Sequence, residues 1–276
     1  MLSDDIIVVD SCSSNRTVEF ASTGVAESGD DLTKFSTIFQ WFQRLIYPAL
    51  MQRPSTYPVR VVQHPFVSHG KQRTWMLESI PLKYQWVYIL EADERMTPEL
   101  FAECQQAMKN PEYIAYYVAE RVLFMNSWIR HSTQYPPYQL RLFRHGKVWF
   151  TDYGHTEREV CYGETSFLQE TYPHYTCSKG FSRWIEKHNR YSTDEARETL
   201  NQIEHSKLNL HELFFGKSEV VRRRALKDFS LLLPAISLIR FIYIYFLLGA
   251  CLDGIAGIAW CPLQAFYEYF ILLKVW

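Results

Sequence analysis

The chain has 276 residues, of which 47% are hydrophobic, so it is long and apolar enough for one large core or for one core with an appendage. Its 29 Lys and Arg residues balance 30 Asp and Glu residues, which gives no overall charge to attract nucleic acid. The six cysteines form no C-x-x-C pair and have no histidines at zinc spacing, so we expect reduced thiols in a cytoplasmic protein, and no secretory signal is expected at the N-terminus.

The first apolar run, Ile6–Val9, predicts a strand that ends at Asp10. A polar loop begins at Ser11 and leads to a helix start at Thr17. Asp10 is therefore a candidate to bind a nucleotide base or ribose, and Ser11 a candidate to lie beside the phosphates. The alternative for Asp10 is a residue that only caps the turn.

Residues 22–59 interrupt this pattern. A Gly-, Ser- and Asp-rich stretch precedes Phe35–Met51, whose apolar residues recur at helical spacing. We interpret the segment as an inserted loop with an amphipathic helix. The helix has three alternative roles, namely packing on the domain, contacting a membrane or covering a ligand, and packing is favoured.

A second strand is predicted at Val59–Val62, and a helix follows from Gly70 to Trp75. Lys71 and Arg73 lie near the start of this helix, where they are candidates to bind a diphosphate. The alternative is that both are ordinary solvated side chains.

The segment Trp86–Leu100 combines a buried-strand pattern, an acidic cluster and a helix start. Thr97 is suited to the N-cap and Pro98 to the first helical turn. Glu91 and Asp93 then lie just past a central strand, where open α/β sheets place their ligands. Because Mg²⁺ and Mn²⁺ prefer hard oxygen ligands, both residues are candidate metal ligands. The alternative is a solvated acidic turn.

A helix is expected to about Lys109, followed by strands at Ile114–Val122 and Gln139–Arg144. Arg141 on the latter is a candidate to contact the donor. The segment from Trp149 to Arg158 gathers acids, a histidine and an arginine beside aromatic residues, and Glu157 there is a candidate general base.

A long polar helix is predicted from Trp184 toward Leu208, and the C-terminal quarter then becomes apolar. The cluster Arg222–Arg224 precedes two apolar stretches, Phe229–Leu252 and Gly254–Leu273, each long enough to cross a bilayer. Prolines and charges inside them favour a helical pair lying on the membrane surface. The competing interpretation is a buried helical subdomain.

Five ordered motifs resemble those of family 2 glycosyltransferases of the lipopolysaccharide-core and exopolysaccharide type, over Asp5 to about Glu198. They are V-V-D-S-x-S-x-x-R-T-V-E, Q-H-P-F-V-x-x-G-K-Q-R-x-W, W-V-x-x-L-x-A-D-E-x-x-T-P-E-L, Q-L-R-L-F-R-x-G and K-H-N-R-Y-S-x-x-E-A. The resemblance implies a GT-A fold, that is, an α/β, Rossmann-like and mostly parallel sheet with flanking helices. Here a C-terminal apolar helical tail is added.

The resemblance also implies a nucleotide-sugar donor, a divalent cation (Mg²⁺ or Mn²⁺) and an inverting displacement. By analogy Asp10 contacts the base, Glu91 the ribose or metal, and Asp93 the metal and diphosphate. Glu157 acts as base toward an acceptor hydroxyl. The sequence departs from the family in having Glu91 where Asp is usual and Asn15 in place of another Asp, and in starting after the usual first strand.

We therefore expect a glycosyltransferase domain at residues 1–208 and a membrane-associated helical tail at 209–276. The expected function is metal-dependent transfer to a lipopolysaccharide-core, lipid-linked or exopolysaccharide acceptor at the cytoplasmic face of the plasma membrane. One alternative is a catalytically weak, membrane-associated binding or scaffold protein, and another is a soluble nucleotidyltransferase.

Overall fold

The computed structural model describes residues 5–11, 59–153, 156–205 and 235–276, in two compact units, 1–85 and 86–276. Several predicted features lie outside the described residues. They are the insert apart from Val59, its helix Phe35–Met51, the helix start at Thr17, the cluster Arg222–Arg224 and the domain boundary at 208.

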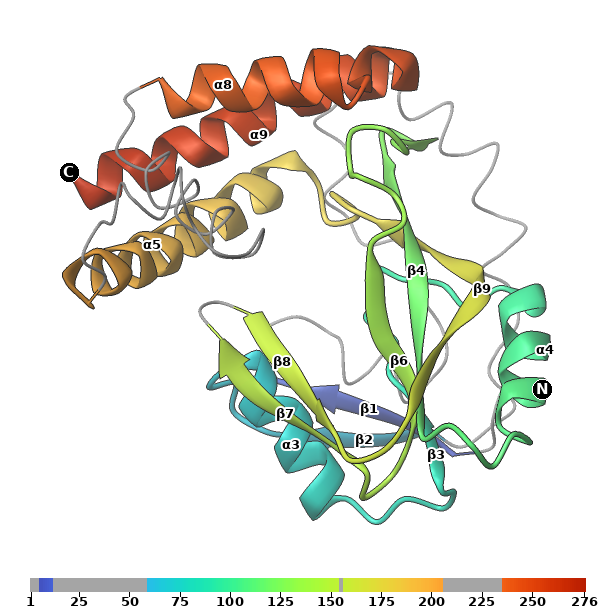
Figure 1. Ribbon diagram of the computed structural model, residues 1–276. Coiled ribbons are helices and arrows are strands. Elements are labelled where there is room, and N and C mark those ends of the chain that lie inside the picture. Colours follow the sequence, from blue (N-terminus) through green and yellow to red (C-terminus); the bar gives the residue numbers. More distant parts are fainter. Residues whose placement is uncertain (1–4, 12–58, 154–155, 206–234) are drawn as a thin grey trace, which may run out of the picture. The chain divides into compact units, whose positions relative to one another are not determined.

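The first unit contains a two-stranded parallel sheet and a helix (Figure 1). Strand β1 (Ile6–Asp10) pairs with β2 (Val59–Gln63), as their branched apolar residues predict. Helix α3 (His69–Ser79) follows, and the hydroxyl of Ser68 caps it by accepting a hydrogen bond from the Lys71 amide at 3.3 Å. The two strands and the helix confirm the sequence-based elements of this region.

The second unit is built on a five-stranded sheet. Strands β3 (Trp86–Tyr88), β6 (Tyr138–Arg144), β4 (Ala115–Phe124) and β5 (Ser127–Trp128) are neighbours in this order and antiparallel, while β9 (Thr165–Tyr175) pairs parallel with β4. Strands β7 (Val148–Tyr153) and β8 (Thr156–Cys161) form a separate hairpin. The described sheets are therefore mixed rather than mostly parallel, because the connections from β4 through β5 to β6 are too short for parallel crossovers.

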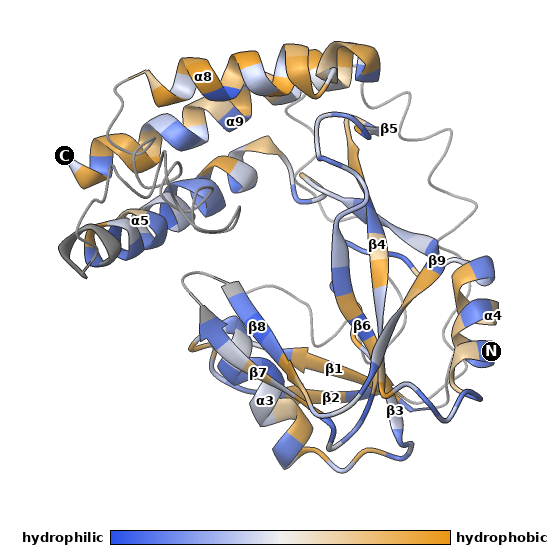
Figure 2. Cartoon of the chain, in the orientation of Figure 1, coloured by the Kyte–Doolittle hydropathy of each residue, from blue (hydrophilic) through white to orange (hydrophobic). Residues whose placement is uncertain are grey.

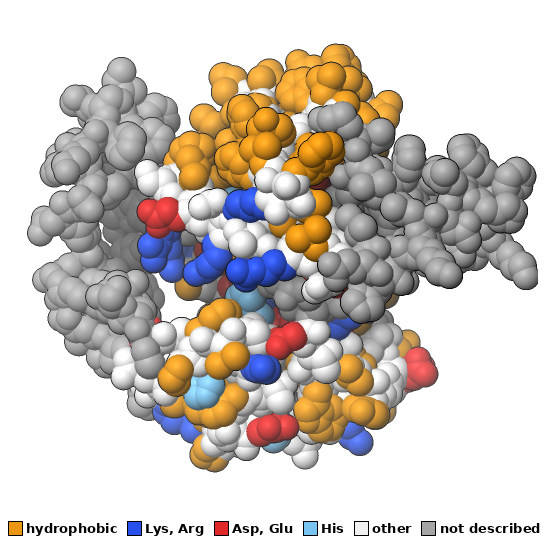
Figure 3. Space-filling model, turned by 90° about the vertical axis from the view of Figure 1, so that its left-hand side faces the viewer, with side chains coloured by type: hydrophobic (Ala, Val, Ile, Leu, Met, Phe, Trp, Pro, Cys, Tyr) orange, Lys and Arg blue, Asp and Glu red, His pale blue; other side chains and the backbone are white. Residues whose placement is uncertain are grey.

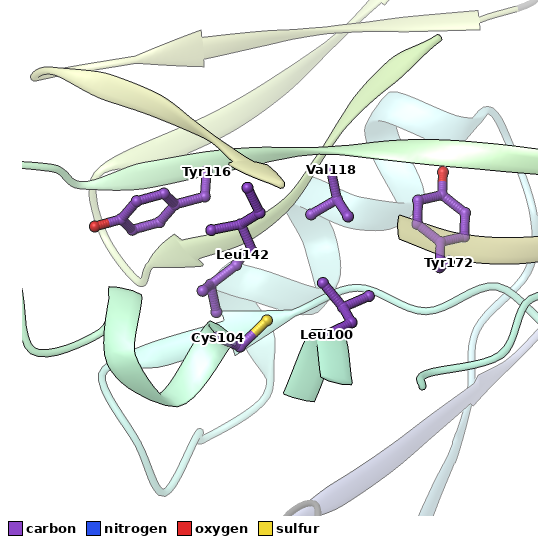
Figure 4. Close-up of a cluster of buried hydrophobic side chains, with 7 residues drawn as sticks. Leu100, Cys104, Tyr116, Val118, Leu142 and Tyr172 are labelled. Carbon is purple, nitrogen blue, oxygen red and sulfur yellow. The ribbon is translucent and has the colours of Figure 1, made fainter. Parts of the chain in front are cut away.

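The core of this sheet lies between its strands and helix α4 (Pro98–Ala107). Thr97 caps the helix by accepting from the Leu100 amide at 3.2 Å, and Pro98 occupies the first turn, as predicted. Leu100 and Cys104 then face the sheet. Figure 4 shows them beside the strand residues Tyr116, Val118, Leu142 and Tyr172.

The C-terminal residues form a group of helices that packs onto the strands. The group consists of α5 (Phe181–His205), α8 (Ile236–Ile242), the π-helical turn η1 (Tyr243–Leu247), the 3₁₀ turn η2 (Ala250–Asp253) and α9 (Gly254–Val275). Trp184 of α5 and Trp260 of α9 share a buried cluster with Phe124 and Ile129. Part of the predicted tail is thus attached to the strands by a hydrophobic core.

Helices α8 and α9 are predominantly apolar (Figure 2). The charges inside the two apolar stretches pair with each other, since Arg240 Nε lies 3.8 Å from Glu268 Oε1. Among the described residues, one helical segment, Ala250–Val275, is long and apolar enough to cross a membrane, and this is weak evidence for a span. Gly249 and Gly254, with φ of 74° and 66°, allow the chain to reverse between the two helices.

Candidate active site

The acidic turn after β3 is fixed by backbone hydrogen bonds to β9. The Tyr175 amide donates to the Asp93 carbonyl at 2.7 Å, and the Arg95 amide donates to the Pro173 carbonyl at 3.1 Å. Within the turn, the Glu91 amide donates to Glu94 Oε2 at 3.0 Å. The turn is therefore attached to the sheet at both its middle and its end.

Arg141 of β6 neutralises the inner side of this turn. Its side chain is 4% exposed and forms an ion pair with Glu94, which is itself 1% exposed. Its Nη1 also lies 3.2 Å from Glu91 Oε1, and its Nε donates to the Tyr172 hydroxyl at 3.2 Å. Burial raises the pKa of Glu94 to about 7 and outweighs the opposing charge of Arg141. The residue predicted to contact a donor is thus buried against the acidic turn.

His174 of β9 joins two further carboxylates. Its Nε2 lies 3.4 Å from Asp93 Oδ2, and its Nδ1 lies 3.3 Å from Glu120 Oε1 on β4. Burial by itself lowers the pKa of His174, but the hydrogen bonds from Asp93 and Glu120 raise it to about 10. The imidazole is therefore positively charged at neutral pH.

Asp93 stays ionised as a consequence. Its burial favours the neutral acid, but the hydrogen bond and charge of His174 outweigh burial and hold the Asp93 pKa below its ordinary value. The Asp93 side chain remains 26% exposed, and that of Glu91 is 45% exposed. Two carboxylates of the turn are thus accessible to a ligand, whereas the carboxyl group of Glu94 is buried.

Tyr172 connects the two halves of this network. Its hydroxyl donates to Glu120 Oε2 at 3.2 Å and accepts from both Nε and Nη2 of Arg141. Four carboxylates (Glu91, Asp93, Glu94 and Glu120) therefore share two cations, Arg141 and His174. The arrangement leaves an excess of negative charge at the exposed end of the turn.

A divalent cation fits this donor set if a substrate supplies further ligands. Among the described residues no three acidic, histidine or cysteine side chains gather as a metal site. Mg²⁺, however, usually takes one or two protein carboxylates together with water and substrate phosphates. Asp93 suits this role because it is ionised and accessible, while Glu91 shares one oxygen with Arg141.

Four of the predicted donor contacts belong to the first unit. Asp10 is 4% exposed, and its Oδ2 accepts a hydrogen bond from Gln63 Nε2 at 3.1 Å, so its carboxylate already has a structural partner. Ser11 and Lys71 are exposed and Arg73 is half-buried. Their proximity to Glu91 and Asp93 stays a prediction.

Glu157 lies on β8, directly opposite Asp152 of β7, and is half-buried. Its role as general base toward an acceptor hydroxyl stays a prediction. Sequence reasoning missed His174 and Glu120, because a single histidine or glutamate on a strand carries no local pattern. Glu94 was visible in the acidic cluster, but only its burial distinguishes it from Glu91.

Comparison with known proteins adds little to this geometry. No protein-family model matches the sequence. Among solved structures, residues 1–349 of S. aureus TarS superpose with a TM-score of 0.35 and 12% sequence identity, over 97% of this chain and 80% of that one. A superposition of this quality establishes neither the fold nor an activity.

Proposed function

We propose that the chain is an inverting, metal-dependent glycosyltransferase that moves a sugar from a nucleotide-sugar donor to an acceptor. The acceptor is a lipopolysaccharide-core, lipid-linked or exopolysaccharide glycan, and the protein is peripheral to the cytoplasmic face of the plasma membrane. The five ordered motifs support the proposal. The observation that carries it furthest is the accessible, ionised Asp93 in a turn fixed just past strand β3.

In this proposal Asp93 and Glu91 hold the cation together with the donor diphosphate. The cation stabilises the negative charge of the departing nucleotide. His174 and Arg141 fix the two carboxylates in place, so that little reorganisation is needed when the donor binds. Asp10 contacts the nucleoside, and Ser11, Lys71 and Arg73 contact the diphosphate. Glu157 takes the proton of the attacking hydroxyl.

The alternative, a catalytically weak binding or scaffold protein, is favoured by one contact. Arg141 already pairs with Glu91, and the longer side chain at this position moves the carboxylate by about one bond length relative to Asp. A binding protein of this kind retains donor affinity and lacks turnover.

The test is a thermal-shift experiment with UDP-, GDP- and dTDP-sugars, each with and without Mn²⁺, on the whole chain and on Asp93→Asn. We expect one nucleotide class to raise the melting temperature only when Mn²⁺ is present, and Asp93→Asn to abolish the rise. Transfer to acceptor in the same conditions separates the enzyme from the scaffold. Stabilisation that is unchanged in Asp93→Asn would contradict the metal role.

The membrane part of the proposal is supported by the outer surface of the C-terminal helices. Large apolar side chains are exposed along α8, η1, η2 and α9, and Figure 3 shows a broad area of hydrophobic side chains. We call this set the apolar surface. The most exposed members are Leu238, Phe246, Leu247, Leu252, Ile255, Phe266, Leu273 and Trp276.

Basic residues accompany the apolar surface. Arg183, Lys187 and Arg190 are exposed at spacings of four and three residues along α5, which packs against α9, so they share one face of that helix. Figure 3 shows Lys and Arg side chains beside the hydrophobic area. This combination suits the interface of an anionic bilayer, where apolar side chains enter the acyl region and basic ones bind headgroups.

A further inference from the structure

The loop that follows β5 is hydrogen-bonded to Asp253, the last residue of η2. Asp253, whose side chain is 3% exposed, accepts hydrogen bonds from the amide and hydroxyl of Ser132 at 2.8 and 2.6 Å. It also accepts from the amide and Nδ1 of His131 at 3.2 and 2.8 Å. Ile129 is fully buried in the cluster beneath the loop. The loop is therefore pre-organised by one buried carboxylate and one apolar anchor.

Two arginines lie near the indole ring of Trp128, next to this loop. The guanidinium of Arg130 lies 5.5 Å from the ring centre of Trp128 and 5.5 Å from that of Tyr135. The guanidinium of Arg121, from β4, lies 6.0 Å from the same indole. Trp128 and Tyr135 contact each other edge to face at 5.0 Å. Cations and aromatic rings thus alternate in one cluster.

Within the part of the chain that the structure describes, no carboxylate pairs with the arginines of this cluster. Among the described residues neither Arg121 nor Arg130 forms an ion pair, and the buried Nε of Arg121 has no hydrogen-bond partner. Arg130 is exposed, and Trp128 is 37% exposed. Both guanidinium groups lie beside the same indole, and an anion bound at this cluster would offset their charge and accept hydrogen bonds from their donors.

Further aromatic rings lie on the same face of the sheet. Trp128 is opposite Leu123 on β4, and Tyr138 is opposite Ala119, which places both on the face that also carries Arg121. Phe167 of β9 contacts Tyr138 edge to face at 4.8 Å. Tyr138 is 41% exposed and Phe167 is 53% exposed. Exposed aromatic rings of this kind present flat apolar surfaces beside polar groups, which suits the faces of sugar rings.

We propose that this face, comprising Arg121, Trp128, Arg130, Tyr135, Tyr138 and Phe167, binds a saccharide that carries an anionic group. The arginines bind the phosphate or carboxylate, and the aromatic side chains contact the sugar rings. The inference deepens the proposed function, on which it rests for the identity of the bound saccharide as acceptor. It predicts an acceptor glycan that is phosphorylated or contains a uronic acid.

The test is saturation-transfer NMR on the whole chain, without donor or metal, so that binding can fail independently of transfer. The probes are glucose 6-phosphate, glucuronate, glucose and inorganic phosphate. We expect the first two to bind more tightly than glucose, with ring protons receiving saturation. Arg130→Gln and Trp128→Ala should each weaken this binding about tenfold, because a charge-assisted hydrogen bond or an aromatic contact is lost.

Matched controls are Arg197→Gln, which changes an arginine 74% exposed on α5, and Tyr162→Ala, which removes an aromatic ring 65% exposed at the β7–β8 hairpin. Both should leave binding unchanged. If glucose bound as tightly as glucose 6-phosphate, the role of the arginines would be overturned. If inorganic phosphate bound as tightly as glucose 6-phosphate, the role of the aromatic rings would be overturned. Absence of binding, or binding that persists in both Arg130→Gln and Trp128→Ala, would overturn the whole proposal.

Discussion

The imidazole Nε2 of His174 lies 3.4 Å from Oδ2 of Asp93, and this contact joins strand β9 to the turn after β3. The same ring reaches Glu120 on β4 through its other nitrogen. Folding raises the pKa of His174, because the ring lies between two carboxylates, and lowers the pKa of Asp93, because the carboxylate lies beside the imidazole. The protonation of this pair therefore couples the exposed turn to the sheet.

The first prediction concerns pH. The His174 pKa rises from 6.5 to about 10 on folding, so its contribution to stability is fully present below pH 6.5 and is lost as the pH rises toward 10. Between about pH 7 and pH 8.5 the free energy of unfolding should fall by about 2 kcal/mol. Urea unfolding at the two pH values measures the fall.

The control for this prediction is His174→Gln, which should show a much smaller fall over the same interval. Glu94, whose pKa is raised to about 7, acts with the same sign, but mainly at lower pH. Equal pH dependence in the two proteins would show that His174 is not the group responsible.

The second prediction concerns the buried ion pair. Arg141→Met removes the cation beside Glu94 and leaves a carboxyl group that is 1% exposed without its charged partner. The free energy of unfolding should fall by about 3 kcal/mol, because Glu94 loses its charge and hydrogen-bond partner and has to take up a proton to stay buried. The double variant Arg141→Met with Glu94→Leu should recover part of this loss in the same urea experiment. A double variant less stable than Arg141→Met would contradict the explanation.

The third prediction concerns Gly257 in α9. A Cβ atom at this position would lie 2.0 Å from the carbonyl oxygen of Ala250, so the turn η2 must move if any side chain is added. Gly257→Ala should therefore lower the melting temperature, although alanine normally stabilises a helix interior by about 1 kcal/mol relative to glycine. Ile258→Ala, at a neighbouring residue that is 49% exposed, serves as the control and should have a smaller effect.

The fourth prediction concerns membrane binding. Leu252 and Ile255 are 73% and 77% exposed on the apolar surface, so replacing both with serine should not disturb the core. Co-sedimentation with phosphatidylglycerol vesicles should weaken at least about tenfold, since burying one such side chain contributes about 1.5–3 kcal/mol. Val160→Ser, at a residue 37% exposed on β8, is the matched control.

The basic face of α5 is tested separately. Arg183→Gln with Lys187→Gln should weaken binding to phosphatidylglycerol vesicles and leave any binding to neutral phosphatidylcholine vesicles unchanged, because each basic residue contributes about 1 kcal/mol only at an anionic surface. Vesicle binding by neither the whole chain nor its variants would remove the membrane from the proposed function.

The sequence by itself determined the elements whose signals are local. The branched residues of β1 and β2, and the Thr97 cap with Pro98, depend on neighbouring residues and were predictable from them. The accessible acidic turn after β3 was visible for the same reason. The apolar composition of the C-terminal residues likewise predicted helix α9.

Only the tertiary structure decided which strands pair and which carboxylates are buried or exposed. Strand direction depends on which segments become neighbours, so the mixed sheet was not visible in a pattern that suits parallel strands. Glu91 and Glu94 are the same residue type in the same acidic cluster. In the structure Glu94 is buried against Arg141, whereas Glu91 is exposed. His174 meets Asp93 across 81 positions of the chain, and a contact between distant residues leaves no periodic trace in the sequence.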